Sequence, residues 1–302
     1  MKKIVVFGGE GFCGKAIVKE LLEKPDVEVY VSDVDSKFFA SGSILDRGYV
    51  RCVVQGAHTV YQIAGLLGTS ELIKTNVDAI RTNIEGTTIV LEESLKAGVK
   101  SFFYPTKPNE WLNTYSITKS AGEEFVRMFG KLHGLGVKIV RWLNIYGPGQ
   151  HVMPVRKAVP TMILQGLEGW PIEIYGDGSQ PVDLQYIDDI ARLTVKYAEL
   201  PGAYLETRDL GATIRISVLE TAELVRELTG KRSEIKHLPM RRGEDQEKVI
   251  GPINGFPVAV MVEDSKMEFY IDGFEKTVEF YELSYTSEER VKALKWHKCG
   301  RY

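Results

Sequence analysis

A glycine-rich stretch near the start of the chain limits what the sequence can fold into. Lys3 to Phe7 is a short, mostly β-branched apolar run, and glycines follow it at positions 8, 9, 11 and 14. Apolar residues then recur at helical spacing from Lys15 to Glu23. The pattern predicts a strand, a tight turn and a helix, in which the glycines let the backbone approach a pyrophosphate. The free N–H groups at the start of that helix would face the phosphates.

An acidic residue at the expected distance supports this interpretation. A second apolar run, Val27 to Val31, leads to Asp33, which lies 19 residues beyond Gly14. In dinucleotide-binding units an acid about 20 residues after the glycines bonds the adenosine ribose hydroxyls. Because a carboxylate there repels a 2′-phosphate, we expect NAD rather than NADP, a preference that the nearby Lys37 weakens.

The composition excludes several classes of protein. The 302 residues are 44% hydrophobic and 26% charged, which is typical of a globular chain, and the formal charge of −3 argues against a nucleic-acid partner. Three scattered cysteines and five dispersed histidines predict neither a disulfide framework nor a metal site. No apolar run reaches the roughly 18 residues that span a bilayer. We therefore expect a cytoplasmic protein with no metal, no nucleic-acid partner and no membrane segment.

Predicted strands and helices alternate through about residue 150. Strands are expected at 59–63, 99–104 and 137–143, and helices at 46–55, 75–97 and from 113 or 114 to 133. This alternation predicts an α/β fold with a doubly wound parallel sheet, the Rossmann arrangement. From Pro148 the pattern becomes irregular, although Ser217 can cap a helix that Gly230 ends and 234–238 can be a strand.

These elements suggest two parts. We expect residues 1–150, with 181–212 returning to them, to form the NAD-binding domain. Residues 151–180 and 213–302 would form a smaller, mixed α/β substrate lobe that closes over the strand ends. Ala64 and Gly65 follow a predicted strand, at the edge where open α/β sheets bind ligands.

A second stretch, Tyr115-Ser116-Ile117-Thr118-Lys119, carries a possible reacting pair. On a helix, Tyr115 and Lys119 share a face. An ammonium near a phenol favours the phenolate and lowers the phenol pKa. The pair would then suit removal of a proton from a sugar or alcohol hydroxyl as hydride leaves its carbon. Tyrosine and lysine four residues apart also occur by chance on many helices, but the preceding glycine stretch favours the functional interpretation.

Several motifs together carry a resemblance to a known family. They are GGEGFCG (8–14), Asp33, QIAG (62–65), NIEGT (83–87), YSITK (115–119), RWLNIYGPGQ (141–150), IEIYGDGSQ (172–180), YIDDIA (186–191), PMRRGED (239–245) and GFEKTVEFY (273–281). With them the chain resembles the extended short-chain dehydrogenase/reductase family, in its NAD-dependent nucleotide-sugar epimerase/dehydratase branch. The resemblance covers most of the sequence.

The resemblance implies roles for individual residues. The cofactor-binding residues would be Gly8, Gly11, Phe12, Cys13, Gly14, Asp33, Ser43, Ala64, Gly65 and Lys119. Tyr115 would be the catalytic acid/base, with Lys119 as its partner and Thr106 as the assisting hydroxyl. Asn144, Tyr175 and Arg241 would bind a nucleotide-diphosphate sugar, with Arg241 clamping the diphosphate.

The residues also allow structural interpretations. Tyr175 could be a core aromatic, Asn144 could cap or turn the chain, and Arg242 could be the clamp in place of Arg241. Asn83 is expected to hold the sheet edge near the cofactor rather than to react.

The chain departs from the family pattern at three places. Thr106 is the best candidate for the usual hydroxyl, but an ungapped match puts Lys107 there. The Asp-Glu pair of 4,6-dehydratases is absent, although Glu110 is near. Val182 stands where the family commonly has an arginine, so one diphosphate contact is missing or comes from Arg156 or Lys157. The segment 251–262 also departs from the pattern.

These observations favour an NAD-dependent nucleotide-sugar 4-epimerase that works through a transient 4-keto sugar. The alternatives are a dehydratase, decarboxylase or reductase of the same branch, and a non-catalytic NAD-binding regulator. The resemblance also implies a homodimer, formed through the helices predicted at 74–97 and 115–133.

Overall fold

The structure is a computed structural model that describes residues 1–34, 36, 40–107, 111–210, 214–230, 233–244 and 270–298. Lys37, Glu110, Cys299 and the segment 251–262 therefore lie outside the described residues.

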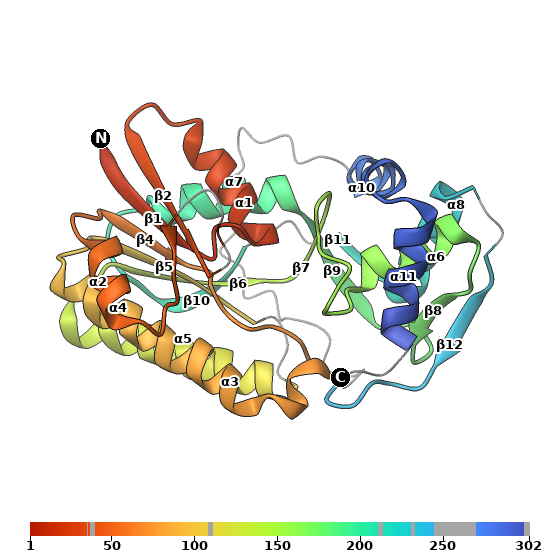
Figure 1. Ribbon diagram of the computed structural model, residues 1–302, viewed down its shortest axis with the longest axis horizontal. Coiled ribbons are helices and arrows are strands. Elements are labelled where there is room, and N and C mark those ends of the chain that lie inside the picture. Colours follow the sequence, from red (N-terminus) through yellow and green to blue (C-terminus); the bar gives the residue numbers. More distant parts are fainter. Residues whose placement is uncertain are drawn as a thin grey trace.

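A seven-stranded sheet forms the centre of the larger part, and every pair of neighbouring strands in it is parallel (Figure 1). The strand order is β10-β6-β5-β4-β1-β2-β3. The strands are β1 (Lys2–Phe7), β2 (Val27–Asp33), β3 (Ala40–Ser41), β4 (Thr59–Gln62), β5 (Ser101–Thr106), β6 (Val137–Trp142) and β10 (Tyr204–Leu210). The chain order reverses between β4 and β1, which is the point where such sheets bind ligands.

Helices cover both faces of this sheet, as Figure 1 shows. One face carries α1 (Phe12–Leu22) and α7 (Ile187–Ala198), and the other carries α2 (Arg47–Val54), α4 (Thr87–Lys96) and α5 (Thr114–His133). Along β1, Val5 and Phe7 belong to the core cluster on the α5 side, and Ile4 and Val6 to the cluster on the α1 side. This alternation buries both faces, so the predicted doubly wound α/β fold is confirmed.

The helical stretch predicted at 75–97 is interrupted. It consists of α3 (Asn76–Ile80), a π-helical turn η2 (Arg81–Gly86) and α4, and a 3₁₀ turn η1 (Glu71–Lys74) precedes it. The apolar periodicity does not distinguish a π turn from an α-helix. The turn carries Asn83, whose side chain is buried.

The smaller part contains two small sheets and four helices among the described residues. One sheet holds β7 (Asn144–Tyr146), β9 (Pro181–Tyr186) and β11 (Ile214–Ser217), and the other holds β8 (Ile172–Tyr175) and β12 (Ile235–Leu238). The helices are α6 (Ala158–Glu168), α8 (Val218–Leu228), α10 (Tyr270–Ser284) and α11 (Ser287–Lys298). Ser217 caps α8 through a capping box with Glu220, and Gly230 follows the helix with φ +61°.

The chain passes between the two parts three times, from β6 to β7, from β9 to α7 and from β10 to β11. Within the segment 181–210, β9 pairs in the small sheet and β10 joins the large one. None of the helices in the described ranges is both long and apolar enough to cross a membrane.

Candidate active site

The glycine turn leaves no room for side chains. Gly8 has φ +81°, and a Cβ on it would lie 2.7 Å from the backbone nitrogen of Ala64. A Cβ on Gly14 would lie 2.1 Å from the carbonyl oxygen of Gly8. Helix α1 starts at Phe12 after Gly11, and no side chain caps its first N–H groups. This cradle fits the pyrophosphate of a dinucleotide, because the backbone is accessible and its N–H groups point out of the helix.

Asp33 lies beside this turn, at the end of β2. Its carboxylate accepts hydrogen bonds from the backbone N–H groups of Glu10 (3.0 Å) and Val34 (2.8 Å). The first bond joins the end of β2 to the glycine turn. Ser43 follows β3 at the sheet edge, and its hydroxyl accepts the N–H of Leu45 at 3.1 Å.

The loop after β4 is held by Asn83. Its side-chain oxygen accepts the N–H of Leu66 (2.8 Å), and its amide donates to the Leu66 carbonyl (2.9 Å) and to the Thr118 hydroxyl (3.0 Å). A Cβ on Gly65 would approach the same Asn83 oxygen to 2.9 Å. Asn83 thus has the supporting geometry expected for it, linking the 64–66 loop to α5.

Tyr115 lies in the first turn of α5, which Asn113 caps by accepting the Ser116 N–H at 2.9 Å. Burial, with a smaller contribution from the nearby Cys13 of α1, raises the pKa of Tyr115 to about 12. Burial likewise raises the pKa of the Cys13 thiol to about 12, against an opposing effect of Lys157. The structure therefore brings Tyr115 to the start of α1, next to the glycine turn.

The position of the Lys119 side chain differs from the sequence prediction. The sequence suggested that its ammonium lowers the pKa of Tyr115, but Lys119 Nζ lies 4.0 Å from the centre of the Tyr104 ring, and burial raises the pKa of Tyr115. Burial also lowers the pKa of Lys119 to about 7, with the Glu123 carboxylate acting in the opposite direction. Packing of the long lysine side chain against β5 decides its direction, and residue spacing alone does not report that.

Thr106 is the last residue of β5, and its side chain is buried. Its hydroxyl makes no hydrogen bond of normal length to the described residues, but it lies near enough to the Glu123 carboxyl of α5 to help lower the pKa of that carboxyl. Lys107 follows it and is half-buried.

A pocket of about 410 Å³ lies where the two parts meet. Its lining is Ser70, Ile73, Lys74, Arg156, Tyr175, Met240, Arg241, Arg242 and His297. Two guanidinium groups lie over the Tyr175 ring, and their central carbons are 5.1 Å (Arg156) and 5.3 Å (Arg241) from the ring centre. The pocket is basic and holds the phenol ring of Tyr175, a composition that suits a phosphorylated ligand with a planar base.

The pocket wall at residues 240–244 is tied to the larger part. Thr69 donates to the Glu244 carboxylate (2.8 Å), Asn113 donates to the Gly243 carbonyl (2.9 Å), and Arg241 pairs with Glu244. Because Asn113 is also the cap of α5, this wall lies next to the start of the helix that carries Tyr115.

Two of the three predicted substrate residues line the pocket, and the third does not. Tyr175 and Arg241 line the pocket together, and Arg242 lines it too. Asn144 begins β7 and is half-buried, with no side-chain hydrogen bond to the described residues. Val182 packs against the apolar core of the smaller part, so its position contributes no charge to the pocket.

Some residues that line the pocket or hold its lining were missed or left open by the sequence interpretation. Glu244 lies inside a motif that was noted only for Arg241 and Arg242, so its spacing three residues after Arg241 was the available signal. His297 and Lys74 gave no signal, because only the fold brings them to the pocket.

Comparisons with known proteins agree with this geometry. The sequence model of a family described as "NAD dependent epimerase/dehydratase family" matches residues 4–209. The low-salt glycan biosynthesis protein Agl12 of Haloferax volcanii is 28% identical over 312 residues, covering 92% of this chain and 98% of that protein. The UDP-N-acetyl-alpha-D-glucosaminuronate decarboxylase of Bacillus cytotoxicus is 27% identical over 273 residues, covering 80% of this chain and 84% of that protein.

A solved structure shows the same fold. The UDP-glucose 4-epimerase of Thermotoga maritima, solved with UDP-glucose, superposes with a TM-score of 0.79 at 24% identity. The match covers 93% of this chain and 99% of that chain.

Proposed function

The chain belongs to the NAD dependent epimerase/dehydratase family, and we propose that it is a nucleotide-sugar 4-epimerase with Tyr115 as its acid/base. The observation that carries the proposal is that Tyr115 lies close enough to Cys13 of α1 for Cys13 to act on its pKa, beside the glycine turn and on the helix whose cap, Asn113, bonds the wall of a basic pocket. In this proposal Tyr115 would transfer the proton between the dinucleotide cradle and a pocket that binds phosphate.

The cofactor cradle consists of backbone and one acid. Gly8, Gly11 and Gly14, with the N–H groups of Phe12 and Cys13, would hold the pyrophosphate, and Asp33 would bond the adenosine ribose. Ser43, Ala64 and Gly65 would border the adenine side and the middle of the cofactor. When bound, NAD supplies a hydride acceptor and donor and a positively charged ring.

Tyr115 would move the proton. Its phenolate would take the proton of the sugar C4 hydroxyl as a hydride leaves C4, and after the 4-keto sugar has turned the resulting phenol would return the proton to the oxygen on C4 as the hydride comes back. Because burial raises the pKa of Tyr115 to about 12, the phenol needs nearby positive charge to act as a base. Lys119 would supply one such charge by turning its protonated amine from the Tyr104 ring toward Tyr115, and Thr106 would orient the reacting hydroxyl.

The basic pocket would hold the nucleoside diphosphate. Arg241 and Arg156 would bind the diphosphate oxygens, and Tyr175 would lie against the base. Arg156 supports the alternative that a second arginine binds the diphosphate where the Val182 side chain cannot, because its guanidinium is fixed by Glu173 at 3.2 Å. Asn144 would bond the sugar or the diphosphate from the start of β7.

An epimerase is favoured over a dehydratase by the end of β5. A dehydratase needs an additional acid that eliminates water, and Thr106 is followed by Lys107 and Pro108 rather than by two carboxylates. The carboxylate next to Thr106 is Glu123, which is engaged by Arg127 and Thr207 and so is not available for that task. The decarboxylase among the relatives keeps decarboxylation of a sugar acid as the second candidate.

The test is a panel of UDP-, dTDP- and GDP-hexoses, with UDP-glucuronic acids included. An epimerase inverts C4, which NMR detects, without net NADH formation and without a change in mass. Loss of water or of carbon dioxide in the mass spectrum would assign the protein to the dehydratase or decarboxylase reaction instead. If nothing turns over while NAD binds equally to the parent protein and to Tyr115→Phe, the chain is a binding protein.

We also propose a homodimer through α3 and α5. These helices expose apolar side chains away from the sheet: Val77 is 67% exposed, Ile80 48%, Ile117 55% and Leu132 67%. Exposed apolar side chains on neighbouring helices are typical of protein–protein contacts. A monomer in analytical ultracentrifugation at micromolar concentration would contradict this.

A further inference from the structure

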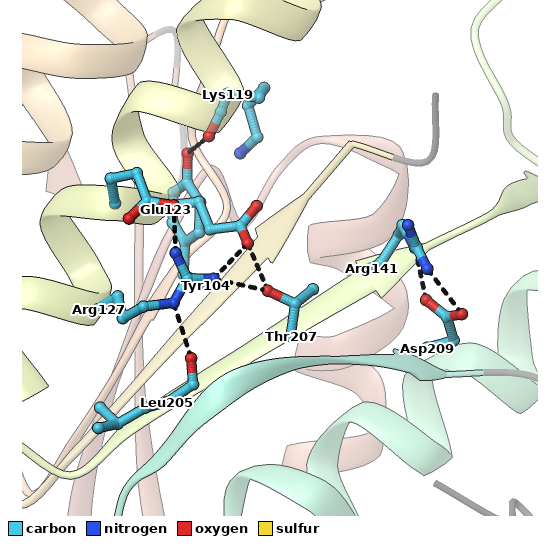
Figure 2. Close-up of polar contacts among 9 residues, drawn as sticks. Tyr104, Lys119, Glu123, Arg127, Arg141, Leu205, Thr207 and Asp209 are labelled. Atoms are coloured by element: carbon cyan, nitrogen blue, oxygen red, sulfur yellow. Dashed lines mark hydrogen bonds and ion pairs between the residues drawn. The ribbon is translucent and has the colours of Figure 1, made fainter. Parts of the chain in front are cut away.

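Glu123 is a buried acid in the same helix as the proposed reacting pair. It lies four residues after Lys119 on α5, so the two side chains leave the same face of the helix. Its side chain is only 15% exposed. Arg127 Nη2 donates to its carboxylate at 2.7 Å, and the Thr207 hydroxyl of β10 donates to the same oxygen (Figure 2). The carboxylate is therefore fixed between α5 and the sheet.

The end of strand β5 lies next to the Glu123 carboxylate. Side chains alternate along a strand, so Tyr104 and Thr106 both face α5. Burial raises the pKa of Glu123, but Thr207, Thr106 and Arg127 together outweigh burial and place it below its usual value. Glu123 is thus ionised at neutral pH.

Lys119 responds to this charge. Its side chain is buried against the Tyr104 ring, and the Tyr104 hydroxyl donates to the Lys119 carbonyl at 3.4 Å (Figure 2). Burial lowers the pKa of Lys119 to about 7, and Glu123 raises it. Without Glu123, Lys119 would lose its proton at a lower pH.

The groups facing Lys119 come from several elements. Tyr115 and Glu123 lie on its own helix, and Tyr104 on β5. The other charged groups on elements packed against α5 are Glu71 and Lys74 of η1, Asp78 of α3, Arg81 and Glu85 of η2, Glu92, Glu93 and Lys96 of α4, Lys138 and Arg141 of β6, and Glu206, Arg208 and Asp209 of β10. Arg141 and Asp209 pair with each other, as do Arg81 and Glu85. Glu123 is the carboxylate that acts on the pKa of Lys119.

We propose that Glu123 is a positioning residue of the site, whose fixed carboxylate keeps the Lys119 ammonium charged and draws the Thr106 hydroxyl toward α5. The inference rests on the proposed roles of Tyr115 and Lys119. In this proposal Glu123 is not expected to touch substrate or cofactor and acts through Lys119 and Thr106.

The chain offers a matched control for the test. Glu124 also pairs with Arg127, but its side chain is 72% exposed and it does not act on the pKa of Lys119. Glu123→Gln and Glu124→Gln each remove one partner of Arg127 and one negative charge, yet only the first removes the charge beside Lys119.

The first measurement needs no reaction. The protein is labelled with [ε-¹³C]lysine, the Lys119 signal is assigned with Lys119→Arg, and its pH titration is followed by NMR in the cofactor-free protein. Glu123→Gln is expected to lower the titration midpoint of Lys119 by about one pH unit, and Glu124→Gln to leave it unchanged. Equal midpoints in the parent protein and Glu123→Gln overturn the inference.

A second variant covers a folding failure. Glu123→Asp keeps the charge but withdraws it by one methylene, so we expect a midpoint lowered by a few tenths of a pH unit. If Glu123→Gln does not fold and Glu123→Asp leaves the midpoint unchanged, the inference is wrong.

The second measurement is the pH profile of kcat on the sugar nucleotide that turns over. Glu123→Gln is expected to lose about tenfold at pH 8 and less than about twofold at pH 5.5, because Lys119 stays protonated at the lower pH. A uniform loss at both pH values would show a purely structural role. If the proposed epimerase reaction fails, the NMR titration still decides the role of Glu123.

Discussion

The Arg156 guanidinium donates a hydrogen bond of 2.7 Å to the Tyr175 hydroxyl and lies across the ring of the same tyrosine. Glu173 holds the other end of the guanidinium at 3.2 Å. An arginine fixed in this way is oriented before any ligand arrives, which reduces the entropy that binding must overcome.

Arg156→Lys should therefore weaken the binding of nucleoside diphosphates. Lysine keeps the charge but loses the planar fork and its fixed orientation, so we expect about tenfold lower affinity for UDP or dTDP. Isothermal titration calorimetry with UDP and with uridine separates the two halves of the ligand. Affinity for uridine should change little.

The control for this prediction is Arg81→Lys, because Arg81 is 61% exposed and lies outside the pocket lining. It should bind UDP as the parent protein does. An unchanged UDP affinity in Arg156→Lys would remove Arg156 from the proposed diphosphate site.

Gly14→Ala should disrupt the cofactor cradle. The added Cβ would lie 2.1 Å from the Gly8 carbonyl oxygen, which is a backbone atom of the same tight turn and cannot move aside as a flexible side chain could. We expect at least about tenfold weaker NADH binding, measured by the fluorescence of the bound nicotinamide, together with a lower melting temperature.

Gly48→Ala is the matched control for Gly14→Ala. Gly48 lies in helix α2, and its added Cβ would meet only the tip of Asp46, at 3.3 Å. This variant should bind NADH normally and gain up to about 1 kcal/mol in unfolding free energy, because alanine favours a helix. Normal NADH binding by Gly14→Ala would contradict the cradle.

The local parts of this site were predictable from sequence because their signals are local. The glycines at 8, 11 and 14 fixed the turn, and Asn113 and Ser217 are found as helix caps. The parallel sheet followed from the alternation of strands and helices. The division into domains, the roles of the site residues and the cytoplasmic location stay predictions.

Tertiary packing determined what the sequence did not reveal. The π turn that carries Asn83 has the same apolar periodicity as a helix, and residue spacing cannot show that Lys119 packs on Tyr104. Arg156 and Tyr175 are 19 residues apart, and only the folding of the smaller part brings them together.

Glu93 should stabilise the fold in a pH-dependent way. Its side chain is 1% exposed and accepts bonds from Lys96 (2.8 Å), Arg51 (2.9 Å) and Arg47 (2.9 Å), joining α4 to α2. The bonds from Lys96 and Arg51, opposed by burial, together lower its pKa to about 2. Since the folded pKa is below the unfolded value of about 4.3, the stabilisation is complete above pH 4.3 and is lost as the pH falls toward 2.

Glu93→Gln is expected to lower the unfolding free energy by about 1 kcal/mol at pH 7, a small value because the three cations are largely exposed. Urea denaturation at several pH values measures this, and the difference from the parent protein should shrink below pH 4. Glu92→Gln is the control, because Glu92 bonds Arg47 but is 39% exposed, and it should change stability by less than about 0.5 kcal/mol. A larger loss in Glu92→Gln than in Glu93→Gln would reverse this ranking.

The buried ammonium of Lys119 should lower the unfolding free energy of the protein. Its pKa of about 7 in the folded protein, against about 10.4 in an unfolded chain, means that the unfolded chain binds more protons between pH 7 and 10. The unfolding free energy therefore rises with pH in that window, and the penalty of the buried charge is complete below pH 7. Lys119→Met should gain about 1 kcal/mol in unfolding free energy at pH 6 in the cofactor-free protein, lose that gain by pH 10, and show far lower turnover.

The control is Lys131→Met, at the exposed end of the same helix, which should shift the unfolding free energy by less than about 0.5 kcal/mol at either pH. Equal urea midpoints for Lys119→Met and the parent protein at pH 6 would show that the ammonium is not penalised by its burial.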